Sequence, residues 1–171
     1  MITIRPAQAE DAEVLPQIEQ SAGEAFRAIP ELAWLADGDN VSVERHCALI
    51  AAGACWVAAD GKDRPVGFLS AGIEDDVLHI WELDVSLDRQ GQGIGRTLLE
   101  RAVADARWRG LAAVTLTTFR AVPWNAPFYR KLGFRALEGV EIDGRLAGLL
   151  GDEAEHGMPW DQRCAMRLDL R

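Results

Sequence analysis

The chain has 171 residues, of which 49% are hydrophobic and 26% are charged, a composition that supports one folded domain and excludes a predominantly disordered chain. Its formal net charge of −9 disfavours general binding to nucleic acid or to anionic membranes, because both need a positive protein surface. The sequence shows no secretory leader, no bilayer-spanning apolar run and no CxxC pair, so we expect a cytoplasmic protein with reduced cysteines and no metal site.

Periodicity predicts helices in the first third of the chain and strands interleaved with helices thereafter. Strands are expected where apolar side chains alternate or run continuously, at residues 2–5, 55–59, 66–73, 77–85, 112–118, 134–137 and 163–170. Helices are expected at residues 11–26, 31–35, 42–52, 93–109 and 123–132. Residues 139–161 are rich in glycine and acid, and we expect them to form a loop region.

Three of the expected helices carry further signals. Pro16 sits awkwardly in the helix at 11–26 and indicates a late start or a bent first turn. Ser42 can cap the helix at 42–52, and we expect this helix to turn Val43, Cys47 and Ile50 inward. The helix at 93–109 has the strongest apolar face and ends at Gly110. That face consists of Ile94, Leu98, Leu99, Ala102, Val103 and Ala106.

A glycine-rich turn connects the strand at 77–85 to this strongest helix. Gly91, Gly93 and Gly95 alternate along the turn and leave amide N–H groups free at a helix N-terminus, which predicts an anion site. The spacing does not fit the dinucleotide fingerprint G-x-G-x-x-G, and the Gly-Lys-Ser/Thr of a P-loop is absent. A nucleotide-binding dehydrogenase is therefore excluded, whereas another phosphate-bearing ligand is not.

The charge distribution supports an anionic ligand. Residues 89–135 contain nine basic and two acidic side chains, a net charge of +7, against −16 in the rest of the chain. Half of the basic residues therefore surround the glycine-rich turn, and a polyphosphate explains this clustering better than an ordinary solvated helix face does.

Two motifs at the right separation resemble those of the GNAT N-acetyltransferase superfamily. Gln90-Gly91-Gln92-Gly93-Ile94-Gly95 is similar to its Q/R-x-x-G-x-G/A motif, and Phe128-Tyr129-Arg130-Lys131-Leu132-Gly133-Phe134 is similar to its later F/L-Y-x-x-x-G-F segment. The resemblance implies a single α/β (α+β) domain over residues 1–171, with a mixed, mostly antiparallel sheet that is splayed in the middle and flanked by helices. It also implies an acetyl-CoA-dependent enzyme that acetylates a primary amine by direct attack in a ternary complex, and a homodimer is common in that superfamily.

The resemblance assigns the cofactor-binding residues. The main chain of Leu83, Asp84 and Val85 would pair with the pantetheine arm of acetyl-CoA. The pyrophosphate would be held by the amides of the turn, namely Gln90, Gly91, Gln92, Gly93, Ile94, Gly95 and Arg96. Phe128 is assigned to the same site. The family often has an asparagine seven residues before its tyrosine, but that position is Val122 here and Asn125 lies four residues before. A contact from Asn125 to the pantetheine arm would therefore need a shifted geometry.

Tyr129 matches the general acid of the family, which would protonate the departing thiolate of coenzyme A. Two residues stay open as the base that takes the proton of the amine. His79 falls where histone acetyltransferases carry a glutamate and arylalkylamine N-acetyltransferases a histidine, and Glu82 is the alternative. Strand alternation places them on opposite faces, although a bulge after Trp81 would change that phase.

The acceptor site is expected to draw on aromatic side chains of the first helices and of strand ends: Phe26, Trp34, Trp81 and Trp124. Whether the acceptor is a small-molecule amine or a peptide or protein amine stays open. The overall acidity mildly favours a cationic acceptor. The alternative function is a catalytically silent module that binds acyl-CoA and acts in regulation or interaction.

Overall fold

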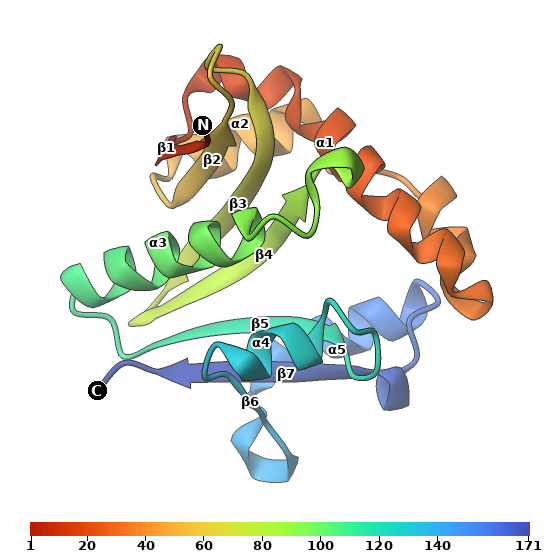
Figure 1. Cartoon of the computed structure of the whole chain (residues 1–171). Coiled ribbons are helices and arrows are strands. Elements are labelled where there is room, and N and C mark those ends of the chain that lie inside the picture. The colour runs from red at the N-terminus through yellow and green to blue at the C-terminus, as the bar shows by residue number, and fades with distance from the viewer. The chain divides into compact units, whose positions relative to one another are not determined.

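The computed structural model describes residues 1–171 and divides into two compact units. Unit 1 comprises Met1–Ile73 and Ile80–Trp108, and unit 2 comprises Glu74–His79 and Arg109–Arg171. Seven strands are hydrogen-bonded in the order β1-β2-β3-β4-β5-β7-β6, and strand β4 contributes residues to both units (Figure 1). The expectation of one domain over residues 1–171 stays a prediction.

Most elements lie within a few residues of their predicted positions. The strands are β1 (Thr3–Pro6), β2 (Cys55–Ala59), β3 (Pro65–Glu74), β4 (Val77–Val85), β5 (Ala113–Phe119), β6 (Arg135–Ala136) and β7 (Arg163–Asp169). The α-helices are α1 (Leu15–Gly23), α2 (Val43–Ala51), α3 (Ile94–Trp108), α4 (Ala126–Lys131) and α5 (Gly144–Glu155). Short 3-10 helices are η1 (Ala9–Glu13), η2 (Glu24–Ala28), η3 (Pro30–Asp37), η4 (Leu87–Arg89), η5 (Gly139–Glu141) and η6 (Trp160–Gln162). No helix is long and apolar enough to cross a membrane. The predicted mixed, mostly antiparallel fold is confirmed.

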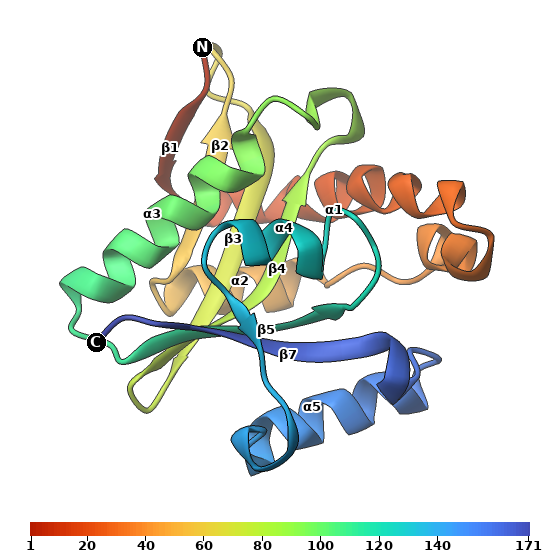
Figure 2. The same cartoon turned by 60° about the horizontal axis from the view of Figure 1, so that its bottom comes forward.

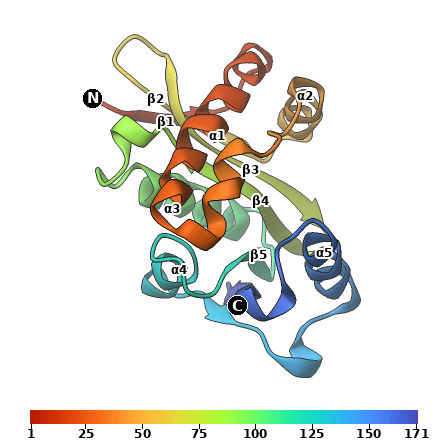
Figure 3. The same ribbon diagram turned by 90° about the vertical axis from the view of Figure 1, so that its right-hand side faces the viewer.

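In unit 1, helices cover both faces of the strands. Strand β2 pairs antiparallel with β1 and β3, and Figures 1 and 3 show α3 on one face and α1 and α2 on the other. Leu15 and Ile18 of α1 pack with Val57 and Phe68 of the strands in one core cluster. The other face is covered by α3, whose six predicted apolar residues are all buried.

The first predicted helix is wrong in its extent, because three short helices occupy residues 9–28. The Asp11 carboxylate accepts the N–H of Gln8 and two N–H groups of Arg5, which holds helix η1 to strand β1. Pro16 then lies in the first turn of α1, where its missing N–H costs nothing. The late start that Pro16 indicated is therefore confirmed.

The predicted inward face of α2 is also wrong in part. Ser42 caps the helix by accepting the N–H of Arg45, as predicted, but the buried residues are His46 and Leu49, and Cys47 is exposed. The His46 ring packs edge-on against Phe68 with 5.3 Å between ring centroids. Burial lowers the pKa of His46 below its usual 6.5, so this imidazole behaves as an apolar ring in the core.

In unit 2, strands β5 and β7 form the central antiparallel pair. β5 pairs with β7 over its full length, and β6 pairs with the far edge of β7. Parallel pairing between β4 and β5 covers only residues 77–79 of β4, opposite residues 113–115 of β5. Helices α4 and α5 lie on opposite faces of this pair (Figure 2).

Helix α5 overturns the expectation of a loop over residues 139–161. Asp143 caps it by accepting the N–H of Leu146, and Leu146 and Leu150 are buried against Leu137 and Ala165. Glycines at three of its positions hid this apolar spacing, because glycine is a poor helix former. Packing of the leucine face against the sheet outweighs that weak propensity.

Candidate active site

The glycine-rich turn has the backbone geometry that its sequence predicted. Gly91 and Gly93 have φ values of +75° and +81°, and a Cβ built on either meets no atom within 4 Å. The turn is anchored at both ends, because the Gln90 Nε2 donates to Val85 O at 3.0 Å and the Leu87 N–H donates to the Ser21 hydroxyl at 2.9 Å. The backbone is therefore held in place while its outer side is open to a ligand.

The start of α3 leaves amides available beside this open surface. Thr97 is the first residue whose N–H reaches a helical acceptor, the carbonyl of Gly93 at 3.1 Å. The N–H groups of Ile94, Gly95 and Arg96 therefore have no acceptor within the helix, and they carry the positive end of the helix dipole. These features fit the diphosphate of a coenzyme A ester, which needs several convergent N–H donors and space close to the backbone.

Strand β4 reaches this turn with Asp84 and Val85 on opposite faces. A Cβ built on Gly67 of β3 would lie 3.2 Å from Val85 Cγ2 and 3.4 Å from Ile94 Cγ2, so Val85 lies on the face that α3 covers. The Asp84 side chain lies on the other face, where the charge of Glu19 in α1 acts on it. The carbonyl of Asp84 is 3.1 Å from the same built Cβ, which shows how closely β3 and β4 approach here.

Side chains on β4 do not alternate strictly before this point. Trp81 is an odd number of residues from Asp84 and would lie on the opposite face in a regular strand. Its ring nevertheless faces Arg45 of α2, 5.9 Å from the ring centroid, and its Nε1 is 3.0 Å from a Cβ built on Gly72. Gly72 shares a face with Phe68, which packs against α1 and α2. The alternation is thus interrupted between Trp81 and Asp84, as a β-bulge would do.

Two carboxyl groups share a hydrogen bond on this face. Glu82 hydrogen-bonds the Asp84 side chain, and Asp84 Oδ2 is buried without a hydrogen-bond partner. Burial and the nearby charge of Glu19 raise the pKa of Asp84 from 3.8 to about 7. A carboxyl group that titrates near neutral pH is suited to accept a proton from a substrate.

Glu19 holds the segment before α2 to α1. Both of its carboxylate oxygens accept the N–H of Val41, at 2.9 and 2.8 Å. Burial raises the pKa of Glu19, while the Val41 N–H opposes that shift. Sequence reasoning missed Glu19, because nothing in the helical pattern of α1 distinguishes it from a solvent-facing acid.

His79 lies in unit 2 and belongs to a different network. It is 1% exposed, and its Nδ1 is 2.9 Å from Thr115 Oγ1, which also accepts from Arg145 Nη2 at 3.1 Å. Burial, reinforced by the charge of Arg145 and opposed by that of Asp143, lowers the pKa of His79 from 6.5 to about 3. The imidazole is therefore neutral and weakly basic throughout the physiological pH range.

Tyr129 also lies in unit 2, on α4. It is 9% exposed and packs edge-on between Phe128 and Phe134, with ring centroids 5.1 and 5.7 Å away. Its backbone carbonyl accepts the N–H of Phe134, which fixes the turn after the helix. These contacts hold the phenol ring in one orientation.

Asn125 does not occupy the family's usual asparagine position in sequence, and its side chain has a partner within the protein. Asn125 Oδ1 accepts the N–H of Phe119 at 3.3 Å. Its own carbonyl accepts the N–H of Tyr129 at the start of α4. Asn125 therefore connects the end of β5 to the helix that carries the tyrosine.

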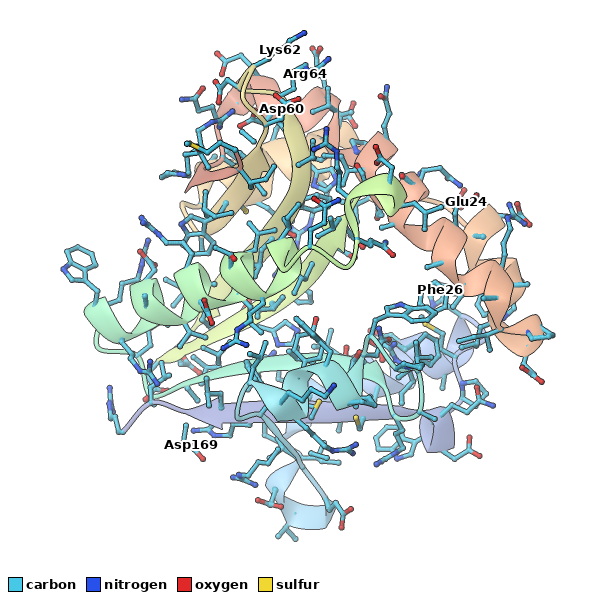
Figure 4. All side chains as sticks on the ribbon, in the orientation of Figure 1. Glu24, Phe26, Asp60, Lys62, Arg64 and Asp169 are labelled. Atoms are coloured by element: carbon cyan, nitrogen blue, oxygen red, sulfur yellow. The ribbon has the colours of Figure 1, made fainter.

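The predicted aromatic residues lie in both units. Phe26 is half-buried on η2, next to Glu24 (Figure 4), whereas Trp34 on η3 is 44% exposed. Trp81 is half-buried beneath Arg45, and Trp124 in unit 2 is 39% exposed. Of the four, only Trp81 lies on β4, the strand that carries Glu82 and Asp84.

The raised pKa of Asp84 gives a stability prediction. The folded state binds this proton more tightly than the unfolded state, so the contribution of Asp84 to stability is fully present below pH 3.8 and is lost as pH rises to about 7. At about 1.4 kcal/mol per pKa unit, the full loss is roughly 4 kcal/mol. Asp84→Asn should remove most of this decline and raise the Tm at pH 8, measured by thermal unfolding between pH 5 and 8. Asp88→Asn, at an exposed position, is the control and should keep the decline. An unchanged decline in Asp84→Asn would contradict the assignment.

Comparison with known proteins places the chain in a family. The model of the "Acetyltransferase (GNAT) family" matches residues 16–134. The serotonin N-acetyltransferase 2 of Oryza sativa chloroplasts is 39% identical over 79 residues, which are 45% of this chain and 38% of that protein. The peptidyl-lysine N-acetyltransferase YjaB of Salmonella typhimurium is 28% identical over 143 residues, which are 84% of this chain and 90% of that protein.

Solved structures share the fold at low sequence identity. The PaiA N-acetyltransferase of Thermoplasma acidophilum, in complex with coenzyme A, has a TM-score of 0.72 at 19% identity, covering 99% of each chain. The ribosomal-protein-S18-alanine N-acetyltransferase of Escherichia coli has a TM-score of 0.69 at 18% identity, covering 99% of this chain and 94% of that one. No group of three or more His, Cys, Asp or Glu residues could hold a metal ion. The chain belongs to the acetyltransferase (GNAT) family, a family of acetyl-CoA-dependent N-acetyltransferases.

Proposed function

We propose that the chain transfers the acetyl group of acetyl-CoA to a primary amine by direct attack in a ternary complex. The observation that carries this proposal is the open turn at Gly91 and Gly93, which presents the unpaired amides of α3 within the family's motif. Leu83, Asp84 and Val85 would pair with the pantetheine arm through their main chain. Gln90 to Arg96 would hold the diphosphate.

The proton balance of the reaction requires a base and an acid. An amine enters as an ammonium and gives one proton to a base before it attacks the thioester carbon. When the carbon–sulfur bond breaks, the thiolate takes a proton from the acid, Tyr129. The second proton of the nitrogen leaves the intermediate, so one proton is bound by coenzyme A and one is released to solvent.

The hydrogen-bonded pair of Glu82 and Asp84 supports the base role better than His79 does. An alkylammonium has a pKa of about 10, so a base near 7 accepts its proton at lower cost than an imidazole near 3. The pKa of Asp84 is raised to about 7 and that of His79 is lowered to about 3. We therefore assign proton transfer to the pair and a positioning role in unit 2 to His79.

The acceptor is a primary amine on a small molecule or on a peptide or protein. Relatives with matching sequence are named for serotonin and for peptidyl-lysine, which are both primary amines on alkyl chains. The alternative function, a catalytically silent module that binds acyl-CoA, has no observation in its favour.

Incubation with acetyl-CoA and a panel of primary amines should release free coenzyme A only when an amine is present, with the acetylated amine detected by mass. Tyr129→Phe should lower kcat by about 100-fold, because the thiolate then leaves without its acid. Binding of acetyl-CoA, measured by calorimetry, should be unchanged in this variant. A full rate in Tyr129→Phe would remove the acid role, and acetyl-CoA binding with no transfer to any amine would support the silent module.

Gly93→Val should weaken acetyl-CoA binding by more than about tenfold, since a branched side chain strains a position at φ +81° and covers the amides. Gly110→Val is a matched control at the other end of α3, with φ +73° and equally open space around a built Cβ. Both variants should lose similar stability in thermal unfolding, but only Gly93→Val should lose affinity in titration calorimetry. Equal affinity in the two variants would contradict the diphosphate site.

Glu82→Gln should lower kcat by about 100-fold, because the carboxyl pair then lacks one of its two acidic groups. His79→Gln, which keeps a polar partner for Thr115, should leave the acidic limb of the pH–rate profile near pH 7 in place. The profile of kcat/KM from pH 5 to 9 distinguishes the two assignments. If His79→Gln lost the acidic limb of the profile and Glu82→Gln kept it, His79 would be the base and the carboxyl pair would not.

A further inference from the structure

A side chain of helix α1 holds the segment that leads into the glycine-rich turn. The Ser21 hydroxyl accepts the N–H of Leu87 at 2.9 Å, although the two residues are 66 positions apart in the chain (Figure 1). Ser21 lies near the end of α1, and Leu87 is the first residue of η4, which ends directly before Gln90. Both residues belong to unit 1. Helix α1 therefore supports the turn from outside the family's motif.

The conformation of the turn depends on its anchors, because its own residues are free to rotate. Gly91 and Gly93 have positive φ values, and glycine has more backbone freedom than any other residue. On the helix side the turn is well held, since the N–H and the hydroxyl of Thr97 both donate to the carbonyl of Gly93, at 3.1 and 2.9 Å. What fixes the other side of the turn is therefore important for its shape.

Two successive amides hold that other side. The Ser86 N–H donates to the carbonyl of Val66 in β3 at 2.9 Å, which continues the contact between β3 and β4. The next N–H, that of Leu87, donates to the Ser21 hydroxyl instead. Leu87 is 47% exposed, so water can replace this acceptor at little cost in stability. Loss of the bond would nevertheless release the start of η4 from α1.

Helix α1 is a firm support for this contact, because the two residues before Ser21 also form hydrogen bonds to other segments. Glu19 accepts the N–H of Val41 at 2.9 and 2.8 Å. Gln20 Nε2 donates to the carbonyl of Ala36 at 2.7 Å. Together with the buried apolar face of the helix, these bonds fix the position of the Ser21 hydroxyl.

We propose that Ser21 is a positioning residue for the diphosphate-binding turn, which it holds open before acetyl-CoA binds. A ligand that meets a preformed turn avoids the entropy cost of ordering it, so the Ser21 contact raises affinity without touching the ligand. This inference rests on the proposed function and deepens it, because it assigns a role in cofactor affinity to a residue of α1. Ser21 takes no part in the acyl transfer itself.

The test replaces the hydroxyl and measures affinity and turnover separately. Ser21→Ala removes the acceptor of the Leu87 N–H, and alanine is a good helix former, so α1 should still fold. The Kd for acetyl-CoA in titration calorimetry should rise about fivefold, the effect of one hydrogen bond. The KM for acetyl-CoA should rise by the same factor, while kcat at saturating acetyl-CoA stays unchanged. Ser21→Thr keeps a hydroxyl and should restore the affinity.

Ser42→Ala is the matched control. The Ser42 hydroxyl also accepts a backbone N–H in unit 1, that of Arg45 at 3.1 Å, but it does so at the start of α2. Ser42→Ala should lower the Tm at least as much as Ser21→Ala and should leave the Kd for acetyl-CoA unchanged. Equal weakening in both variants would show that affinity merely follows stability and would overturn the inference. A Ser21→Thr variant with a normal Tm but the weak affinity of Ser21→Ala would overturn it as well.

The same measurements separate this inference from the proposed function. If Ser21→Ala weakens acetyl-CoA binding but the unmodified chain acetylates no amine, the positioning role stands and the proposed function fails. If the unmodified chain acetylates an amine and Ser21→Ala binds acetyl-CoA as tightly as it does, the inference is overturned and the proposed function stands. If the unmodified chain does not bind acetyl-CoA, both fail.

Discussion

The proposed cofactor site depends on the backbone N–H groups at the start of α3, which have no acceptor within the helix. A helix N-terminus normally satisfies its first amides with a side-chain cap, but two glycines with positive φ precede this one and leave its surface open. The turn is held by hydrogen bonds from Gln90 to Val85 and from Leu87 to Ser21. These bonds tie the turn to β4 and to α1, the two elements that carry Asp84 and Glu19.

The interrupted side-chain alternation of β4 directs neighbouring residues to different helices. After the interruption, Val85 faces α3 and packs near its first residue. Asp84 faces α1, where the charge of Glu19 raises its pKa. A regular strand would direct Trp81 and Asp84 to opposite faces and would separate the aromatic ring from the carboxyl groups. The cost is a buried carboxyl oxygen with no partner, and such a cost is usual where binding or catalysis needs a group that folding alone would not keep.

The sequence predicts those helices and strands whose buried side is visible in their own residues. The predicted ranges of helix α3 and of strands β2 and β4 agree closely with the structure, because each has an apolar face or a continuous apolar run. Helix α5 was missed because glycines interrupt its leucine face and only tertiary packing restores it. The inward face of α2 was misjudged because His46 reads as polar yet is buried as a neutral ring. The effect of Glu19 on Asp84 could not be predicted, since the fold alone brings α1 to the end of β4.

Burial and helix α5 together set the histidine of β4 apart from its carboxyl groups. Arg145 donates to Thr115, the residue that holds His79, and the charge of the guanidinium and burial together suppress protonation of the imidazole. A second polar contact of the same helix, from Arg163 of β7 to Glu153, fixes α5 against the sheet. Burial is the main reason that the pKa of His79 is low, and Arg145, in the segment expected to be a loop, lowers it further. Adjacent parts of β4 carry an imidazole whose pKa is lowered and a carboxyl group whose pKa is raised, and this difference in environment, more than the residue types, is the reason for proposing the carboxyl pair as the base.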